Sequence, residues 1–261
     1  MTELLRATGL TVTFGGLRAN DEIDLAVDEG ALVGLIGPNG AGKTTLIDAL
    51  TGFVPAEGSI VFAGRDITRL APHRRARLGL GRTWQSLELF DDLTIRANLQ
   101  VSAQRQSVGG FLLDLVVPGR SRDHADVDFA LEVLGIEHLA DAMPDEISQG
   151  QRKLVSTARA LAARPRLVCK DEPAAGLDVN ESEELGRQLR RIVDAGITVL
   201  LVDHDMGLVL SVCDRLHVIE FGEKIAEGTP TEVQRDPLVI AAYLGEGDAT
   251  DDAAHRGDGR S

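Results

Sequence analysis

The fold is decided by the stretch Ala-Leu-Val-Gly-Leu-Ile-Gly-Pro-Asn-Gly-Ala-Gly-Lys-Thr-Thr, residues 31–45 of the 261-residue chain. Its first six residues form an apolar run between glycines, which predicts a strand buried on both faces. Gly37, Gly42, Lys43 and Thr44 then fit the spacing G-x-x-x-x-G-K-[ST], and apolar residues at helical spacing follow as far as Gly52. Strand, glycine-rich loop and helix, in this order, are the setting that a phosphate-binding P-loop requires.

This loop predicts a site for the phosphates of a nucleotide. Glycines let the backbone N–H groups turn inward toward phosphate oxygens, and the N-terminus of the next helix adds its positive dipole end. Lys43 would place a positive charge on the β- and γ-phosphates, and the Thr44 hydroxyl would hold Mg²⁺. A dinucleotide-binding loop fits less well, because the glycines are not spaced as G-x-G-x-x-G. The predicted nucleotide-binding residues of the loop are Gly37, Pro38, Asn39, Gly40, Ala41, Gly42, Lys43, Thr44 and Thr45.

The composition is that of a globular protein, with 43% hydrophobic and 26% charged residues. No apolar stretch reaches the roughly 18–20 residues of a membrane span. The start of the chain has no hydrophobic secretory segment, and Cys169 and Cys213 need no disulfide, so we expect a cytoplasmic protein. The formal net charge of −14 argues against nucleic-acid binding. A basic cluster at 73–77 and Arg82 remains, for which a solvated face is the simplest interpretation.

Strands and helices alternate along the chain, which predicts an α/β fold with parallel strands. Two strands that look antiparallel precede the P-loop, which is unusual for a plain doubly wound fold. The region from about 86 to 165 is mostly helical and is interpreted as an inserted subdomain. Residues 215–222 and 224–228 are predicted as two edge strands, and residues 246–261 as a disordered polar tail.

Polar side chains follow three of the predicted strands, at the sheet edge where ligands bind in such folds. Beyond the P-loop, Asp171 would hold Mg²⁺ through water, and Glu172 could polarise the attacking water as a general base. His204 could contact the γ-phosphate, and Gln85 could bind the metal or the water. Each has a plain alternative when taken alone: a helix-start carboxylate, a capping histidine or a loop amide. Their order after a P-loop favours nucleotide hydrolysis.

One aromatic side chain, Phe14, ends the first predicted strand and could stack on an adenine ring. An ordinary strand aromatic remains the alternative from this residue alone. With Phe14 included, the chain resembles the ATP-binding subunits of ABC transporters over about residues 4–245. The motifs that carry the resemblance are Phe14 at the adenine-stacking position, Walker A at 37–44, the Q-loop at Gln85, the signature at 147–151, Walker B at 167–172, the D-loop at 175–178 and the switch histidine at His204.

The resemblance implies an ABC ATPase domain over residues 1–245, with a mixed sheet, an antiparallel β subdomain and the inserted helical subdomain. It implies binding and hydrolysis of ATP with Mg²⁺. Ser148, Gly150 and Gln151 would close over the γ-phosphate held by a second ATPase subunit, either the same chain or a paralogue. The other implied partners are two transmembrane permeases and, indirectly, a substrate-binding protein, with no nucleic acid. The chain would then be peripheral on the inner face of the cell membrane.

The finer resemblance is to the branched-chain amino-acid uptake group, on the sequences at 14–17, 71–74, 171–177, 204–206 and 221–230. Urea and amide importers share much of this pattern, so the substrate stays open. Two other classes are alternatives. A soluble ABC protein of DNA repair or translation is disfavoured by the single cassette and the acidic charge. A small-molecule kinase is disfavoured by the complete signature.

Two residues depart from the family pattern. Gln149 replaces the first glycine of the signature, while Ser148 and Gly150 remain. Lys170 stands where Walker B is normally apolar, and strand alternation places it on the face opposite Asp171. Because a buried, unpaired ammonium is costly, we expect Lys170 to reach solvent or a carboxylate, or to be neutral.

Overall fold

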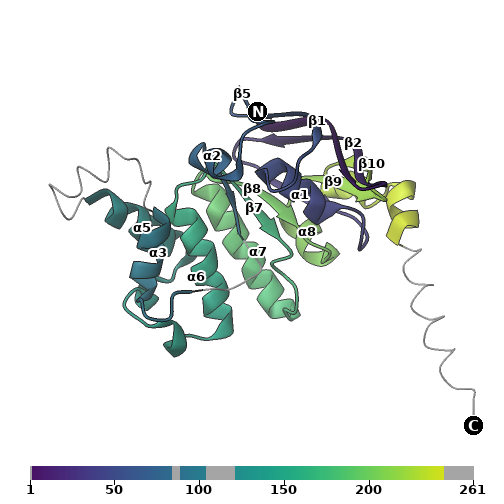
Figure 1. Cartoon of the computed structure of the whole chain (residues 1–261). Helices are drawn as coiled ribbons and strands as arrows, with labels where there is room; N and C mark the ends of the chain where they lie inside the picture. The colour runs from purple at the N-terminus through teal and green to yellow at the C-terminus, as the bar shows by residue number, and fades with distance from the viewer. Residues whose placement is uncertain (1, 84–88, 104–120, 244–261) are drawn as a thin grey trace, which may run out of the picture.

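Two β-sheets pack together, as Figure 1 shows, in a computed structural model that describes residues 2–83, 89–103 and 121–243. The first sheet is antiparallel and confirms the expected β subdomain before and after the P-loop. Its order is β2–β1–β4–β5, from β1 (Glu3–Phe14), β2 (Leu17–Asp28), β4 (Glu57–Phe62) and β5 (Arg65–Asp66).

The second sheet is mixed, as the fold class predicts: five strands are parallel and β10 runs antiparallel to β9. Its order is β10–β9–β3–β8–β7–β6, from β3 (Leu32–Ile36), β6 (Leu80–Arg82), β7 (Leu167–Asp171), β8 (Thr198–Val202), β9 (Arg215–Glu220) and β10 (Glu223–Gly228). The prediction of two edge strands is wrong for β9, which pairs with β3 and buries Leu216 to Ile219. Hydrophobic pattern does not reveal which strand lies next to which.

Helices cover both faces of the mixed sheet (Figure 1). On one face, α1 shares a core with the antiparallel sheet, and on the other face α6, α7 and α8 share a core with α3 and α5. No described helix is both long enough and apolar enough to cross a membrane. The helices are α1 (Lys43–Thr51), α2 (Pro72–Arg77), α3 (Ile95–Ala103), α5 (Ser121–Leu134), α6 (Gln149–Ala162), α7 (Val179–Asp194), α8 (Met206–Val212) and α9 (Pro230–Val233), with two short 3₁₀ turns at Glu137–Leu139 and Pro144–Glu146 and a further helical segment over 237–243.

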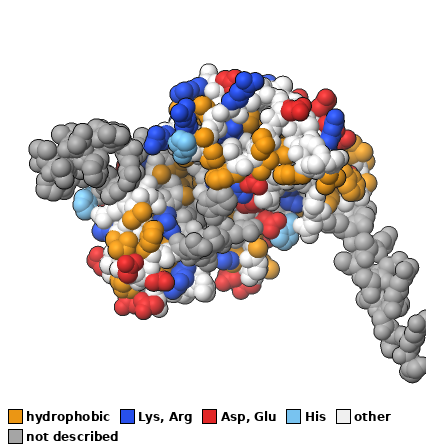
Figure 2. Space-filling view, viewed as in Figure 1, with side chains coloured by type: hydrophobic (Ala, Val, Ile, Leu, Met, Phe, Trp, Pro, Cys, Tyr) orange, Lys and Arg blue, Asp and Glu red, His pale blue; other side chains and the backbone are white. Residues whose placement is uncertain are grey.

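The basic cluster around α2 is only partly a solvated face. Basic side chains gather at the surface over α2 and β5 in Figure 2. Arg75, however, is buried and donates hydrogen bonds of 2.7 Å to the carbonyls of both Ala49 and Leu50. A positive charge at this position interacts favourably with the negative end of the α1 dipole. Arg82 is also buried, so the expectation of a solvated face is wrong for both residues.

Lys170 lies inside strand β7, where every residue is buried. It is 4% exposed, and its amine donates to the Thr157 hydroxyl of α6 at 2.8 Å. The expected opposite face is confirmed, but Lys170 reaches neither solvent nor a carboxylate of the described residues. Burial lowers the pKa of Lys170 to about 8, toward the neutral form.

We predict that Lys170→Met stabilises the fold near pH 7. The folded-state pKa lies below the ordinary value of 10.5, so burying the charged amine opposes folding at pH values below about 8. Removing it should raise the free energy of unfolding by about 1–3 kcal/mol, as measured by urea unfolding.

The gain should shrink as pH rises from about 8 to 10.5, where the folded wild-type protein loses this proton before the unfolded chain does. Lys224→Met, which removes a lysine on strand β10 that is bonded to Glu227, is the control and should show no such gain. A constant difference between Lys170→Met and wild type from pH 7 to pH 10.5 would contradict the assigned cause.

Candidate active site

The P-loop has no room for side chains at two of its glycines. A Cβ atom on Gly37 would lie 2.0 Å from the carbonyl oxygen of Ile219, and one on Gly42 would lie 2.4 Å from that of Ala19. Both glycines also have positive φ values, 153° and 97°, which L side chains rarely adopt. The loop is thus wedged between β2 and the end of β9.

Lys43 is the first residue of α1 and lies against this loop. Its amine donates to the carbonyl oxygens of Gly37 at 2.6 Å and Pro38 at 2.8 Å, and the side chain is buried. The N-terminal N–H groups and positive dipole end of α1 are therefore combined with a lysine at one loop. Phe14 ends β1 with its side chain half exposed.

Asp171, the last residue of β7, carries an oxygen suited to a metal. Its Oδ2 accepts from Arg82 at 3.3 Å, and its carboxylate also faces the Thr44 hydroxyl. Its Oδ1 is buried and has no hydrogen-bond partner among the described residues. Burial raises the pKa of Asp171, and the Arg82 guanidinium opposes this shift.

Mg²⁺ fits this pair of oxygen ligands, because it is bound through one or two protein oxygens plus substrate phosphates and waters. Within the described residues there is no group of three or more histidine, cysteine or acidic side chains that could form a metal site from protein alone. Thr44 and Asp171 are thus suited to a metal that arrives with a nucleotide.

Glu172 and His204 lie side by side at the carboxyl ends of β7 and β8. Oε1 of Glu172 is 4.0 Å from Nδ1 of His204, and both side chains are partly exposed. The Glu172 backbone is held in the left-handed region, at a φ of 45°, and its N–H donates to the Val202 carbonyl at 2.7 Å. A strained backbone at a position that directs a carboxylate outward is a common feature of functional sites.

Sequence reasoning missed Asp203, which fixes the two strand ends to each other. It is fully buried and accepts three backbone N–H groups: from Ala174 at 2.9 Å, His204 at 2.8 Å and Asp205 at 3.0 Å. The loops after β7 and β8 therefore share one carboxylate. The only available signal was an acidic residue in an apolar strand, next to the histidine.

Arg82 is the second residue that sequence reasoning missed in the site. It ion-pairs with Asp48 of α1 and with Asp171 of β7, and its side chain is 8% exposed. These two ion pairs hold Asp171, the candidate metal ligand, close to helix α1, which starts at the P-loop. Nothing in the local sequence separates this arginine from the neighbouring surface arginines.

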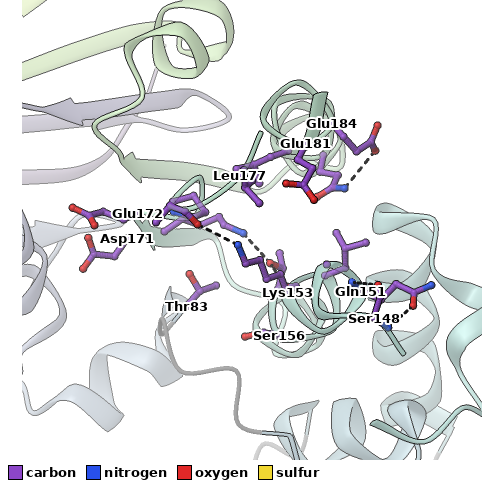
Figure 3. Close-up of a pocket in the computed structure, with 18 residues that line it drawn as sticks. Thr83, Ser148, Gln151, Lys153, Ser156, Asp171, Glu172, Leu177, Glu181 and Glu184 are labelled. Carbon is purple, nitrogen blue, oxygen red and sulfur yellow. Dashed lines mark hydrogen bonds between the residues drawn. The ribbon is translucent and has the colours of Figure 1, made fainter. Parts of the chain in front are cut away.

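The signature residues begin helix α6. Ser148 is the N-cap, accepting from the Gln151 N–H at 3.2 Å, while the Gln151 side chain accepts from the Ser148 N–H at 2.9 Å. In Figure 3, Ser148 lies across the pocket from Asp171 and Glu172. No residue of the P-loop is among those that line this pocket. Gln85, the remaining predicted site residue, lies outside the described residues.

Comparison with known proteins agrees with this geometry. A family model described as ABC transporter matches residues 20–175, and one described as branched-chain amino acid ATP-binding cassette transporter matches residues 223–249. The chain is 39% identical to the high-affinity branched-chain amino acid transport ATP-binding protein BraF of Pseudomonas aeruginosa, over 93% of this chain and 98% of that protein.

The chain is 38% identical to the lipopolysaccharide export system ATP-binding protein LptB of Escherichia coli, over 93% of this chain and 97% of that protein. The ADP conformation of MJ1267, an ATP-binding cassette of an ABC transporter, superposes with a TM-score of 0.81 at 32% identity, covering 94% of this chain and all of that one. The chain belongs to the ABC transporter family, as an ATP-binding subunit with ATPase activity.

Proposed function

We propose that this chain hydrolyses ATP to drive the import of branched-chain amino acids. The observation that carries the proposal is the second family match, because residues 223–249 fit a branched-chain amino acid cassette specifically. The likeness to BraF over nearly the whole chain supports it. Transport implies membrane permease partners, and we infer two of them, a second ATPase subunit and a substrate-binding protein.

We assign the chemistry to Glu172 and His204, which follow the neighbouring strands β7 and β8. Glu172 would take the proton of the attacking water, and His204, 4.0 Å away, would orient it toward the γ-phosphate. Gln85 would contribute to the same water or metal. Lys43 and the P-loop N–H groups would stabilise charge on the phosphates, and Phe14 would stack on the adenine.

The metal in this proposal is Mg²⁺, held by Thr44 and Asp171. When bound, it would neutralise developing charge on the phosphate oxygens. Arg82 would keep Asp171 in place by pairing with it at 3.3 Å.

We place the permease contact at a groove of about 720 Å³ beside α2, β6 and α6. It is lined by the half-exposed Phe53 and by Pro72, His73, Thr83 and Ser156. A chain docked there would be peripheral on the inner face of the membrane. The proposed division is an ABC ATPase domain at 1–245 with a helical subdomain at about 86–165, followed by a tail.

A second candidate, export, is favoured by one observation, the 38% identity to LptB. Uptake of labelled leucine, urea and acetamide by cells with and without this chain separates the possibilities. Loss of leucine uptake supports the proposal, loss of urea or acetamide uptake supports the related importers, and unchanged uptake of all three would contradict import. Cofractionation with membranes rather than nucleic acid excludes a repair or translation role.

The first prediction for this site concerns Lys43→Ala. Losing the phosphate-facing charge should weaken Mg-ATP binding at least about tenfold, as measured by calorimetry on the purified chain. Lys224→Ala, a lysine on strand β10 bonded to Glu227, is the matched control and should bind normally. Near-normal ATP hydrolysis by a folded Lys43→Ala protein would overturn the P-loop assignment.

The second prediction for this site concerns the variant Glu172→Gln. Removing the general base should slow ATP turnover by about 10²–10⁴-fold while leaving ATP affinity nearly unchanged. Glu223→Gln on the edge strand β10 is the control and should hydrolyse ATP at the wild-type rate. If Glu172→Gln turns over ATP normally, the base lies elsewhere, and His204 is the next residue to test.

The third prediction for this site concerns whether one chain or two chains supply the residues that bind each nucleotide. One chain carries two helix N-termini suited to phosphate, at Lys43 in α1 and at Ser148 in α6. If each nucleotide uses both, two chains must pack head to tail. A dimer mixed from Lys43→Ala and Ser148→Arg subunits then has one site with both defects and one intact site.

The mixed dimer should retain ATP at a single site, whereas each mutant homodimer should retain none. Nucleotide retention is measured on dimers purified through two different affinity tags, so that mixing is established independently. Retention no higher than in either homodimer would exclude a shared site in a homodimer and would direct the search to a paralogous partner.

A further inference from the structure

Asp203 is a buried carboxylate whose charge is not balanced by a lysine or an arginine. It directly follows β8, and its side chain is fully buried. Within the described residues, the one basic side chain that comes within 4.0 Å of this carboxylate is His204, with Nδ1 at 3.8 Å from Oδ1. Removing a charge from water without a cation is costly, so a carboxylate at this position needs a physical reason.

The two oxygens of this carboxylate serve different loops. Oδ1 accepts the N–H groups of His204 at 2.8 Å and Asp205 at 3.0 Å, in the loop after β8. Oδ2 accepts the Ala174 N–H at 2.9 Å, in the loop after β7 that begins at Glu172. Because Glu172 lies two residues before Ala174, this third bond limits how far Glu172 can move relative to the loop of His204.

The His204 ring has its Nδ1 atom near two carboxylates. Nδ1 lies 3.8 Å from Oδ1 of Asp203 and 4.0 Å from Oε1 of Glu172. Neither distance is that of a hydrogen bond, but two negative charges at this range favour a proton on Nδ1 over one on Nε2. In a neutral ring the lone pair is then on Nε2, where it can accept a hydrogen bond from a water molecule.

We propose that Asp203 is a positioning residue for ATP hydrolysis, acting through His204 and Glu172. Its bond to the Ala174 N–H keeps the loop of Glu172 against the loop of His204. Its charge selects the form of the His204 ring that accepts from the attacking water. The inference rests on the proposed roles of Glu172 and His204, and it extends them to a residue that is too deeply buried to contact the nucleotide.

The first test is Asp203→Asn, which keeps the size of the side chain and removes its charge. In either amide orientation the NH₂ group faces a backbone N–H donor, so at least one of the three hydrogen bonds is lost. For the purified full chain, kcat for ATP should fall at least about tenfold while KM changes less than about threefold, because groups acting in the transition state are misplaced. Thermal melts check that the variant is folded.

The matched control is Asp236→Asn. Asp236 is partly exposed and accepts the Leu238 N–H at 2.8 Å, away from the proposed site. This variant loses the same charge from an aspartate that also accepts a backbone N–H, and it should hydrolyse ATP at the wild-type rate.

A double-mutant cycle with His204→Gln shows whether Asp203 acts through the ring. If it does, Asp203→Asn should slow turnover by less than about threefold in the His204→Gln background, where there is no ring left to position. A role in folding alone predicts the same factor in both backgrounds, and that result would contradict the proposal.

Nitrogen-15 NMR of the histidine rings measures the ring form directly and can be done on the wild-type chain, which avoids any folding defect of a variant. At about pH 8.5, where an ordinary histidine is neutral, His204 should carry its proton on Nδ1. Its signals are assigned by their absence from His204→Gln. Asp203→Asn should shift the population toward the Nε2-protonated ring. A wild-type ring protonated on Nε2 would overturn the proposal.

The single variants separate this proposal from the proposed function. Wild-type turnover by both Glu172→Gln and His204→Gln would remove the roles on which the inference rests. Slow turnover by those two variants, together with a wild-type kcat for Asp203→Asn, would leave the proposed function in place and rule out the role of Asp203 alone.

Discussion

The structure depends on the close approach of three backbone segments at the P-loop. Gly37 meets the Ile219 carbonyl and Gly42 meets the Ala19 carbonyl with no space for a side chain. Two hydrogen bonds complete the contact, from the Gly222 N–H to the Ala41 carbonyl at 3.1 Å and from the Asp21 N–H to the Gly222 carbonyl at 2.8 Å. The loop that would hold phosphates is thus held by contacts to strands of both sheets.

The second constraint is charge at the ends of β6 and β7. Arg82 bridges Asp48 and Asp171, which ties helix α1 to the strand that ends in the two carboxylates. The cost of taking these charges out of water offsets much of their attraction, so the bridge fixes the positions of Asp48 and Asp171 more than it stabilises the fold. The nucleotide loop and the candidate metal ligand consequently keep a fixed relation to each other.

The sequence predicted those features that depend on short-range pattern. Lys43 is identified by its place in a motif of four fixed residues, and Glu172 and His204 by the rule that ligands bind at the carboxyl ends of strands. Arg82 and Asp171 are 89 residues apart, and neither carries a local sign of its partner. The local sequence likewise does not reveal that Lys170 bonds to Thr157 of helix α6, or that β9 pairs with β3. Such pairs are settled by tertiary packing, which propensity and periodicity do not encode.

Asp203 joins the two loops that follow β7 and β8. Because it accepts N–H groups from Ala174, His204 and Asp205, the loops after β7 and β8 cannot separate without exposing a buried carboxylate. Asp205 in turn accepts from the Ser182 hydroxyl of α7 at 2.8 Å, extending the connection to the next helix. The sheet edge that carries Glu172 and His204 is therefore held together by one connected set of hydrogen bonds. On its other side, β7 is joined to helix α6 by two hydrogen bonds, from Lys170 to the Thr157 hydroxyl at 2.8 Å and from Lys153 to the Ala175 carbonyl at 3.3 Å, so the signature helix is tied to the same sheet edge.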